Sequence, residues 1–219
     1  MISVVIPALN AERLLARCFD SLVPAAVRGV VREVIVADGG STDATLAIAD
    51  AAGAHIVQAG RGRGAQMAAG AEKARSEWIL FLHPETALEP GWDGEVESFL
   101  RRALPERPRA AAFRFALEDF GAPARRAEAK AAFRSRVLGL PYGEQGLLVP
   151  LRLYRKVGGY RDLARLEDAD IVRRIGRRRL VMLRSRAVIR ERPRQGWFKA
   201  TALAVLHLLR VPSSVMAKL

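Results

Sequence analysis

The chain has 219 residues, of which 50% are hydrophobic and 27% charged, the ordinary balance of a folded globular domain. Its one cysteine, Cys18, excludes an internal disulfide, and we expect it to be a buried structural thiol. The longest apolar stretch, residues 200–209, is too short for a transmembrane helix, which needs roughly 20 residues. Because no basic leader precedes the first apolar run, a cytoplasmic protein is expected.

The positive charge is unevenly placed. The net charge is +13, yet the first hundred residues carry only eight Lys and Arg against thirteen Asp and Glu. The second part therefore carries the whole positive excess. Such a surface could attract nucleic acid, anionic lipid or a phosphorylated substrate, and a solvated arginine-rich surface explains it equally well.

The first part alternates short apolar runs with helical patterns. Runs rich in β-branched residues and without polar alternation are typical of strands buried on both faces of a parallel sheet. Strands alternating with helices predict βαβ units. The predicted strands cover residues 2–7, 33–37, 55–58 and 78–82, and the predicted helices cover 12–22, a segment capped by Ser41 or Thr42 that ends near 52, and 64–74.

After His83 the pattern loosens, because Pro84, Pro90 and Gly91 break the chain. Helical patterns return at 92–100, 124–138, 151–157, 166–176 and 197–209, and strand patterns at 110–117, 146–150 and 180–183. A compositional break at 101–109 is interpreted as a boundary between subdomains. The last helix, with its flanking basic residues, is interpreted as packed on the core, with an interfacial membrane helix as the alternative.

Polar residues follow three of the predicted strands directly. Asn10 follows the first, Asp38 ends the second within the loop DGGSTD, and His83-Pro84-Glu85 follows the fourth. In parallel α/β sheets, ligands bind in the crevice beyond the carboxyl ends of the strands. Asp38 could accept hydrogen bonds from a nucleoside, or could only organise a turn together with Ser41.

Three further motifs carry candidate chemistry. The glycine-arginine run 60–64 precedes a helix, where backbone N–H groups and arginines favour a phosphate, although it is neither a P-loop nor a dinucleotide fingerprint. Glu85 could bind Mg²⁺ together with a diphosphate, or could be a solvated turn residue. Glu167-Asp168 opens a helix, whose dipole alone explains acidic residues there, and a carboxylate at this place could also be a general base.

Taken in order, these motifs resemble those of family 2 glycosyltransferases with the GT-A fold. The resemblance is carried by ISVVIPALNAE, VIVADGGSTDAT, GRGAQMAAGAEKA and WILFLHPET, and continues through GEQGLLVP, the turn at 158–160 and LEDADIVRRI. The subgroup that the chain is most similar to is that of small bacterial enzymes labelled as arsenosugar-biosynthesis-type glycosyltransferases. The resemblance implies one α/β domain over 1–219, with a mostly parallel central sheet flanked by helices, a nucleotide-sugar-binding half at 1–100 and an acceptor-side half at 101–219.

The resemblance also implies an inverting transfer of a sugar from a nucleotide-diphosphate donor to a hydroxyl acceptor. Asp168 would be the base, beside Glu167, and Glu85 would hold Mg²⁺ or Mn²⁺. Acceptor-side residues would be Glu144 and Gln145. The implied donor-binding residues are Pro7, Ala8, Asn10, Glu12, Asp38, Arg61, Arg63, Gln66, His83, Arg192, Arg194 and Trp197.

Two positions depart from the subgroup pattern. The metal motif reads His-Pro-Glu where relatives tend to have His-Ala-Asp, and GEQ stands where GDQ is usual. Both changes keep the charge, but glutamate is longer by one methylene, and Mg²⁺ tolerates altered geometry poorly.

Two alternative functions stay open on the sequence alone. One is a non-catalytic nucleotide-binding protein on the same scaffold, and the other is a protein that binds nucleic acid or a membrane surface through its basic second part. For an enzyme we expect a nucleotide-sugar donor, an unidentified hydroxyl acceptor and no nucleic acid. Peripheral contact with the inner face of the membrane and a homo-oligomer are both compatible with the chain.

Overall fold

The computed structural model describes residues 1–119, 121–163 and 166–190. The strands are β1 (Ile2–Ala8), β2 (Val31–Asp38), β3 (His55–Gln58), β4 (Trp78–Phe81), β5 (Thr86–Leu88), β6 (Ala110–Leu117), β7 (Leu147–Pro150) and β8 (Leu180–Ile189). The α-helices are α1 (Glu12–Val27), α2 (Thr45–Ala51), α3 (Arg63–Lys73), α4 (Trp92–Arg101), α5 (Ala122–Phe133), α6 (Leu151–Lys156) and α7 (Glu167–Ile175). A π-helical turn, Arg134–Leu138, extends α5, and the 3₁₀ turn Gly143–Gln145 precedes β7.

All the described strands belong to one sheet in the order β3-β2-β1-β4-β7-β6-β8-β5. The half formed by β3, β2, β1 and β4 is parallel, as predicted. β7 then pairs antiparallel with both β4 and β6, β6 pairs parallel with β8, and β5 closes the edge antiparallel to β8. The sheet thus places the ends of β1, β2 and β4 at one edge, where the first three polar motifs lie.

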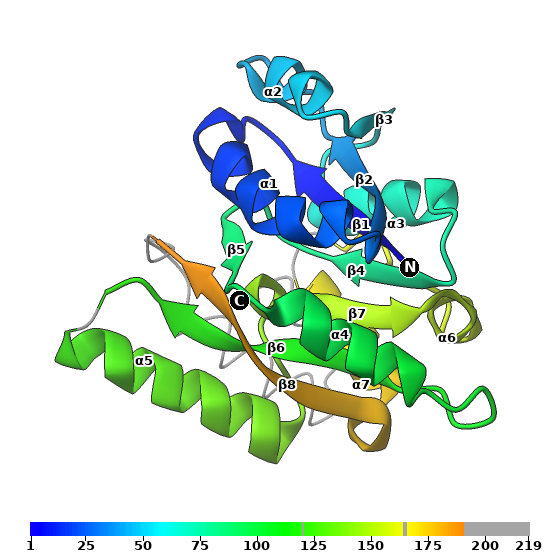
Figure 1. Ribbon diagram of the computed structural model, residues 1–219, viewed down its shortest axis with the longest axis vertical. Helices are drawn as coiled ribbons and strands as arrows, with labels where there is room; N and C mark the ends of the chain where they lie inside the picture. Colours follow the sequence, from blue (N-terminus) through cyan, green and yellow to red (C-terminus); the bar gives the residue numbers. More distant parts are fainter. Residues whose placement is uncertain (120, 164–165, 191–219) are drawn as a thin grey trace.

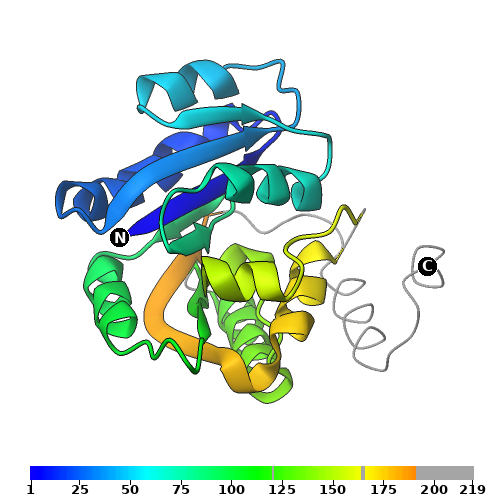
Figure 2. The ribbon, with the colours of Figure 1, turned by 90° about the vertical axis from the view of Figure 1, so that its right-hand side faces the viewer.

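Helices cover both faces of this sheet (Figure 1). One buried cluster joins the inner sides of α1 and α4 to the sheet through side chains such as Leu15, Trp92 and Phe113. The opposite cluster joins α3, α6 and α7 to the sheet through Met67 and Ile171. Figure 2 shows the bend of β8, which carries the sheet from the side of β6 towards β5.

The central strand β1 has a fully buried sequence, which explains its lack of polar alternation. It contains Pro7, which cannot donate a ladder hydrogen bond. β4 pairs with β1 only as far as Val5, opposite Phe81, so Pro7 lies beyond the end of that ladder. Proline at this place therefore costs the sheet no hydrogen bond on the β4 side.

Five local predictions are wrong. The last predicted strand does not end at 183 but continues to Ile189. The first helix does not end at 22 but continues through Pro24 to Val27. The second begins at Thr45 without a side-chain cap, because Ser41 bonds to Asp38 instead. The segment after His83, where the prolines predict no regular structure, contains the short strand β5, and the long basic helix changes to π-helical geometry at 134.

The compositional break at 101–109 does not divide the sheet, since β5 from the first part pairs with β8 from the second. α4 is also tied across this break. Glu95 accepts hydrogen bonds from the backbone of Arg184 and from both the backbone and the hydroxyl of Ser185 on β8. Among the helices of the described residues, none has the length and apolarity required to cross a membrane.

Candidate active site

The loops after β1 and β2 are joined to each other by side-chain hydrogen bonds. Asn10 adopts a left-handed backbone conformation with φ of 51°, which asparagine tolerates better than most residues. Its backbone N–H donates to Ser41 Oγ at 2.9 Å, and its Oδ1 accepts from the backbone of Thr42 at 2.9 Å. Glu12 adds a second connection, because its carboxylate accepts from the backbone of Ala44 at 3.2 Å.

Asp38 lies at the end of β2 with only 1% of its surface exposed. Its carboxylate accepts hydrogen bonds from the backbone of Gly40 and from both the backbone and the hydroxyl of Ser41. Asp38 therefore organises the turn together with Ser41, which is one of the two roles that the sequence allows. Thus Asn10 and Glu12 join the two adjacent strand-end loops, and Asp38 fixes the shape of the second.

Helix α3 approaches this edge with its N-terminus. Gly62, with φ of 122°, gives the chain the turn that starts the helix, and Arg61 lies exposed in the loop before it. Gln66 is buried and donates from Nε2 to the carbonyl of Ala8 at 3.1 Å. Gln66 fills the space beside Gly39, where a Cβ would lie 2.1 Å from its amide nitrogen. Pro7 and Ala8 are buried in β1 beneath these contacts.

His83 is the centre of a cluster of charged side chains beyond the end of β4. It is buried, with 2% of its side chain exposed. Nδ1 lies 3.5 Å from Glu85 Oε1 and also 3.5 Å from Arg63 Nη1, while Nε2 lies 3.6 Å from Asp168 Oδ2. The cluster therefore joins residues that follow β4 to the starts of α3 and α7.

The carboxylates around His83 decide its charge. Burial alone would lower the pKa of His83, but the hydrogen bond with Glu85 and the charges of Asp168 and Glu85 outweigh burial and raise that pKa to about 9. Burial likewise opposes ionisation of Glu85, yet the bond and charge of His83 prevail and lower the pKa of Glu85. At neutral pH the pair is thus an imidazolium beside a carboxylate.

The turn Gly143–Gln145 lies against the same cluster. Gly143 approaches so closely that a Cβ there would lie 2.0 Å from Asp168 Oδ2 and 2.6 Å from His83 Cε1. Burial raises the pKa of Glu144, and the nearby charges of Glu85 and Asp168 add to this effect. The carbonyl of Glu144 accepts from Thr86 Oγ1 on β5 at 3.1 Å.

Gln145 holds this turn in place from its buried side. Its Oε1 accepts hydrogen bonds from the backbone of Tyr142 at 2.9 Å and from the Ser135 hydroxyl at 3.0 Å, and its Nε2 donates to the carbonyl of Phe113 at 2.7 Å. The amide is thus engaged at both ends. The contacts seen for Gln145 position the turn on β6.

Asp168 projects from the first turn of α7 and is oriented by two neighbours. The Tyr160 hydroxyl donates to Asp168 Oδ1 at 2.9 Å, which leaves Oδ2 facing His83 and Gly143. Burial and the charge of Asp168 raise the pKa of Tyr160, so Tyr160 stays a donor. Glu167 pairs with Arg63, Oε1 to Nε at 3.1 Å, and so ties α7 to α3.

The cluster has more carboxylates than cations. Its described members are the acids Glu85, Glu144, Glu167 and Asp168 and the bases Arg63 and His83. No group of three metal-ligating side chains with metal-binding geometry occurs among the described residues. An oxygen-rich excess of negative charge with partly exposed carboxylates, among them Glu85, fits a divalent cation whose remaining ligands come from phosphates and water.

The structure therefore brings together most of the residues that the sequence nominated. His83, Glu85, Arg63, Glu144, Glu167 and Asp168 form one cluster, and Asn10, Glu12, Asp38 and Gln66 fix the adjoining loops. Arg61 has no described contact with the cluster, and Arg192, Arg194 and Trp197 lie outside the described residues. Sequence reasoning missed Tyr160 and Gly143 as site residues. The only sequence signals were that Tyr160 follows a Gly-Gly turn and that Gly143 precedes Glu144.

Comparison with known families places the first half of the chain. Residues 3–110 match the family model described as Glycosyl transferase family 2. The matched segment contains the loops after β1 and β2, the start of α3, and the His83–Glu85 motif. It ends before the turn that carries Glu144 and before α7.

Curated relatives match over a shorter segment. Glucosyl-3-phosphoglycerate synthase of Mycobacterium tuberculosis strain H37Rv is 52% identical over 56 residues, which are 26% of this chain and 17% of the relative. The corresponding protein of Mycolicibacterium paratuberculosis strain K-10 has the same identity and coverage. The match thus spans about one sixth of the length of these curated relatives.

Solved structures match over nearly the whole chain. The M. tuberculosis glucosyl-3-phosphoglycerate synthase in complex with Mn²⁺ and UDP-glucose has a TM-score of 0.69 at 20% identity, covering 97% of this chain and 80% of that one. The same enzyme in complex with phosphoglyceric acid has a TM-score of 0.70 at 21% identity, covering 97% and 81%. At this identity the likeness shows a common fold.

Proposed function

Because the chain belongs to glycosyl transferase family 2, we propose that it transfers a sugar from a nucleoside diphosphate donor to a hydroxyl acceptor with inversion at the anomeric carbon. The donor would be held mainly by residues 1–100 and the acceptor mainly by residues from 101 onward. The observation that carries this proposal is the orientation of Asp168, whose Oδ1 is fixed by Tyr160 while Oδ2 faces the cluster around His83.

The donor pocket is proposed at the joined loops after β1 and β2. Asn10 and Asp38 would border the nucleoside there, and the N-terminus of α3, with Arg61 and Arg63, would border the diphosphate. Helix N-termini and arginines both favour phosphate oxygens. UDP is the first nucleotide to test, because a solved structure with this fold holds UDP-glucose.

Asp168 is proposed as the general base. It would take the proton from the acceptor hydroxyl, whose oxygen then attacks the anomeric carbon on the face opposite the diphosphate. The bond from that carbon to the phosphate oxygen breaks, and its electron pair leaves with the nucleoside diphosphate. Attack from the opposite face inverts the configuration. Tyr160 would keep the basic oxygen aimed at the acceptor.

Glu85 is proposed as the protein's ligand for a divalent cation. Its lowered pKa keeps it ionised, and Mg²⁺ sites commonly use one or two carboxylates together with substrate phosphates. When bound, the cation supplies charge neutralisation for the leaving diphosphate. Arg63 adds a fixed positive charge at the same edge without any metal.

Binding of the donor can be tested by titration calorimetry with UDP and UDP-glucose, with and without Mn²⁺. We expect binding that Mn²⁺ strengthens, and we expect Glu85→Gln to lose the Mn²⁺ effect while the exposed-site control Glu106→Gln keeps it. Lack of binding to every UDP- and GDP-sugar, with or without metal, would overturn the proposed function. Binding that ignores both Mn²⁺ and Glu85→Gln would remove only the metal assignment.

The base is tested by transfer to an acceptor. Phosphoglycerate is the first candidate, because solved structures of the same fold hold it. Asp168→Asn should lower transfer by roughly 10²–10⁴-fold, the usual contribution of a general base, while UDP affinity persists. Asp50→Asn, the same change at an exposed carboxyl on α2, is the control. Undiminished transfer by Asp168→Asn would show that the base is another group.

Membrane contact remains a separate proposal. The apolar and basic segment that suggested it, residues 197–209, lies outside the described residues. Flotation of the protein with anionic vesicles is the direct measurement.

A further inference from the structure

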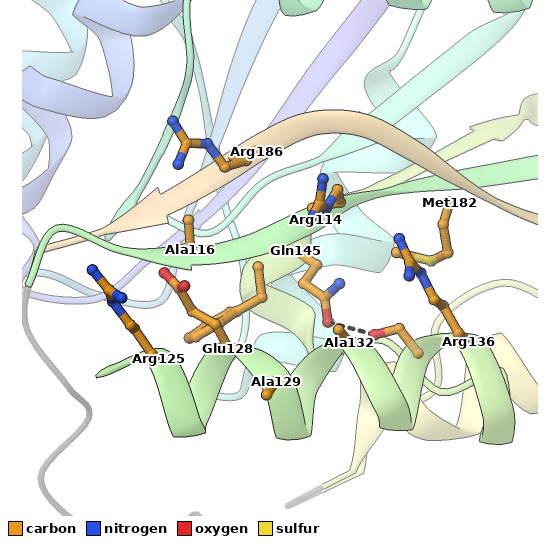
Figure 3. A pocket seen from close by; sticks show the side chains of 12 residues that line it. Arg114, Ala116, Arg125, Glu128, Ala129, Ala132, Arg136, Gln145, Met182 and Arg186 are labelled. Carbon is orange, nitrogen blue, oxygen red and sulfur yellow. Dashed lines mark hydrogen bonds between the residues drawn. The ribbon is translucent and has the colours of Figure 1, made fainter. Parts of the chain in front are cut away.

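A second hollow lies between α5 and the strands β6 and β8, apart from the cluster around His83. It is a cavity of about 280 Å³. Four arginines line it: Arg114 from β6, Arg186 from β8, Arg125 from α5 and Arg136 from the π-helical turn that extends α5. Figure 3 shows Arg125 and Arg136 at opposite ends of the helical side of the cavity, with Glu128 between them. His83, Glu85 and Asp168 are not among its lining residues.

Two of these arginines are neighbours in the sheet. Arg114 and Arg186 occupy paired positions of the parallel strands β6 and β8, and both are exposed. Like charges at directly opposed positions repel and destabilise a sheet. Such an arrangement is favourable only when negative charge is supplied nearby.

The protein's own carboxylates balance only part of that charge, because the acids near the four arginines are Glu89 and Glu128. Arg186 is paired, because its Nε lies 2.7 Å from Glu89 Oε2. Glu128, the one acid of the lining, has Oε1 engaged by the backbone N–H of Leu117 at 2.8 Å. Within the described part of the chain, Arg114, Arg125 and Arg136 form no ion pair.

We propose that this groove binds the phosphate group of a small phosphate ester. Guanidinium groups recognise phosphate oxygens through paired, charge-assisted hydrogen bonds, and three of those in the groove have no ion-pair partner among the described residues. Ala129, Ala132 and Met182 give the same cavity an apolar part for the carbon skeleton of the ester. The volume is at the small end for ligand pockets, which favours a small ester over a whole nucleotide-sugar.

The groove adjoins the proposed reaction centre and shares one side chain with it, that of Gln145. Gln145 lines the groove, and its Oε1 accepts from Ser135, another lining residue, at 3.0 Å. Gln145 also belongs to the turn that carries Glu144. The phosphate ester would therefore lie behind this turn. The site stands on its own geometry and does not depend on the donor or on the assignment of Asp168.

The test is titration of inorganic phosphate by calorimetry at low ionic strength. The double variant Arg125→Gln/Arg136→Gln removes two lining guanidinium groups. The control Arg126→Gln/Arg155→Gln removes the same charge from exposed positions on α5 and α6 outside the lining. We expect phosphate affinity to fall about tenfold or more in the groove variant and to stay near wild type in the control. Melting temperatures verify that both variants are folded.

Equal affinity for phosphate in all three proteins would overturn the proposal, and so would equal losses in the two double variants, since a general charge effect would then suffice. A parallel titration with vesicles of phosphatidylcholine and phosphatidic acid separates the sources of the phosphate group. Vesicle binding that is lost only in the groove variant identifies a lipid headgroup. Phosphate binding without vesicle binding identifies a soluble ester.

Discussion

The close approach of Gly143 to Asp168 gives the sharpest test of the proposed reaction centre. In Gly143→Ala the added Cβ would lie 2.0 Å from Asp168 Oδ2 and 2.6 Å from His83 Cε1. Atoms in van der Waals contact need about 3.5 Å, so the carboxylate or the turn must move by roughly 1 Å or more. Asp168 cannot rotate freely, because the Tyr160 hydroxyl holds its other oxygen at 2.9 Å.

The expected magnitude has two parts. Overpacking of this kind costs about 1–3 kcal/mol of stability, and for a chain of this size each kcal/mol lowers the melting temperature by roughly 2–4 °C. Displacing a reacting group by about 1 Å can cost roughly a hundredfold in rate. We therefore expect Gly143→Ala to fold with a lowered melting temperature, to retain UDP affinity, and to transfer sugar about a hundredfold more slowly.

The control is Gly94→Ala on α4, where the nearest atom to the new Cβ is Arg28 Nη1 at 3.9 Å. Replacing glycine by alanine in a helix stabilises by about 0.5–1 kcal/mol, so this variant should melt no lower than wild type and keep its rate. Rates come from an assay of released nucleoside diphosphate once an acceptor is in hand. A wild-type rate in Gly143→Ala would refute the idea that Asp168 Oδ2 must hold its position.

Three further expectations concern stability and reactivity. Burial tends to raise the pKa of Glu95, but its three hydrogen bonds from β8 prevail and lower that pKa. The stability advantage of wild type over Glu95→Gln in urea should therefore be full above the unfolded-state pKa of about 4.3 and should be lost as the pH falls from there through the lower native-state pKa. Gly70→Ala should lower the free energy of unfolding in urea by about 1–3 kcal/mol, because its Cβ would lie 2.4 Å from Val5 Cγ1. A second change, Val5→Ala, should cost less in that background than in wild type, and strictly additive losses would contradict this. Cys18 is buried and burial raises its thiol pKa, so iodoacetamide should modify it at pH 8 only after unfolding, and rapid native-state labelling would show that the thiol is accessible.

The parallel half of the fold could be predicted because its signals are local. β3 and β6 have the predicted bounds, and β1 and β4 differ from prediction by one residue at their ends. The apolar runs of β1 and β4 reflect burial on both faces, which nearly every residue of each run reports, whereas β3 is a largely exposed edge strand. β5 could not be found this way, because it has three residues and exists only through pairing with β8.

The residues of the candidate site likewise divide into those with a local sequence signal and those without one. Asp38 and Glu85 could be nominated because each directly follows a recognisable strand. Tyr160 could not, since its relation to Asp168 arises from the packing of the turn at 158–160 against α7. The wrong cap at Ser41 has a mixed cause, because Ser41 is engaged by the local turn with Asp38 and by the tertiary contact with Asn10.

The insertion of β7 between β4 and β6 limits how such chains can be recombined. β7 supplies the antiparallel partner of β4, and the turn just before it delivers Glu144 to the cluster behind His83. A fragment ending near residue 110 would leave β4 as an open edge, and it would lack Asp168. A chimaera joined to a relative within residues 101–109 should therefore not fold. A chimaera should fold only when β5, β6, β7 and β8 all come from the same parent. The proposed donor-binding loops and the proposed base therefore depend on one continuous sheet.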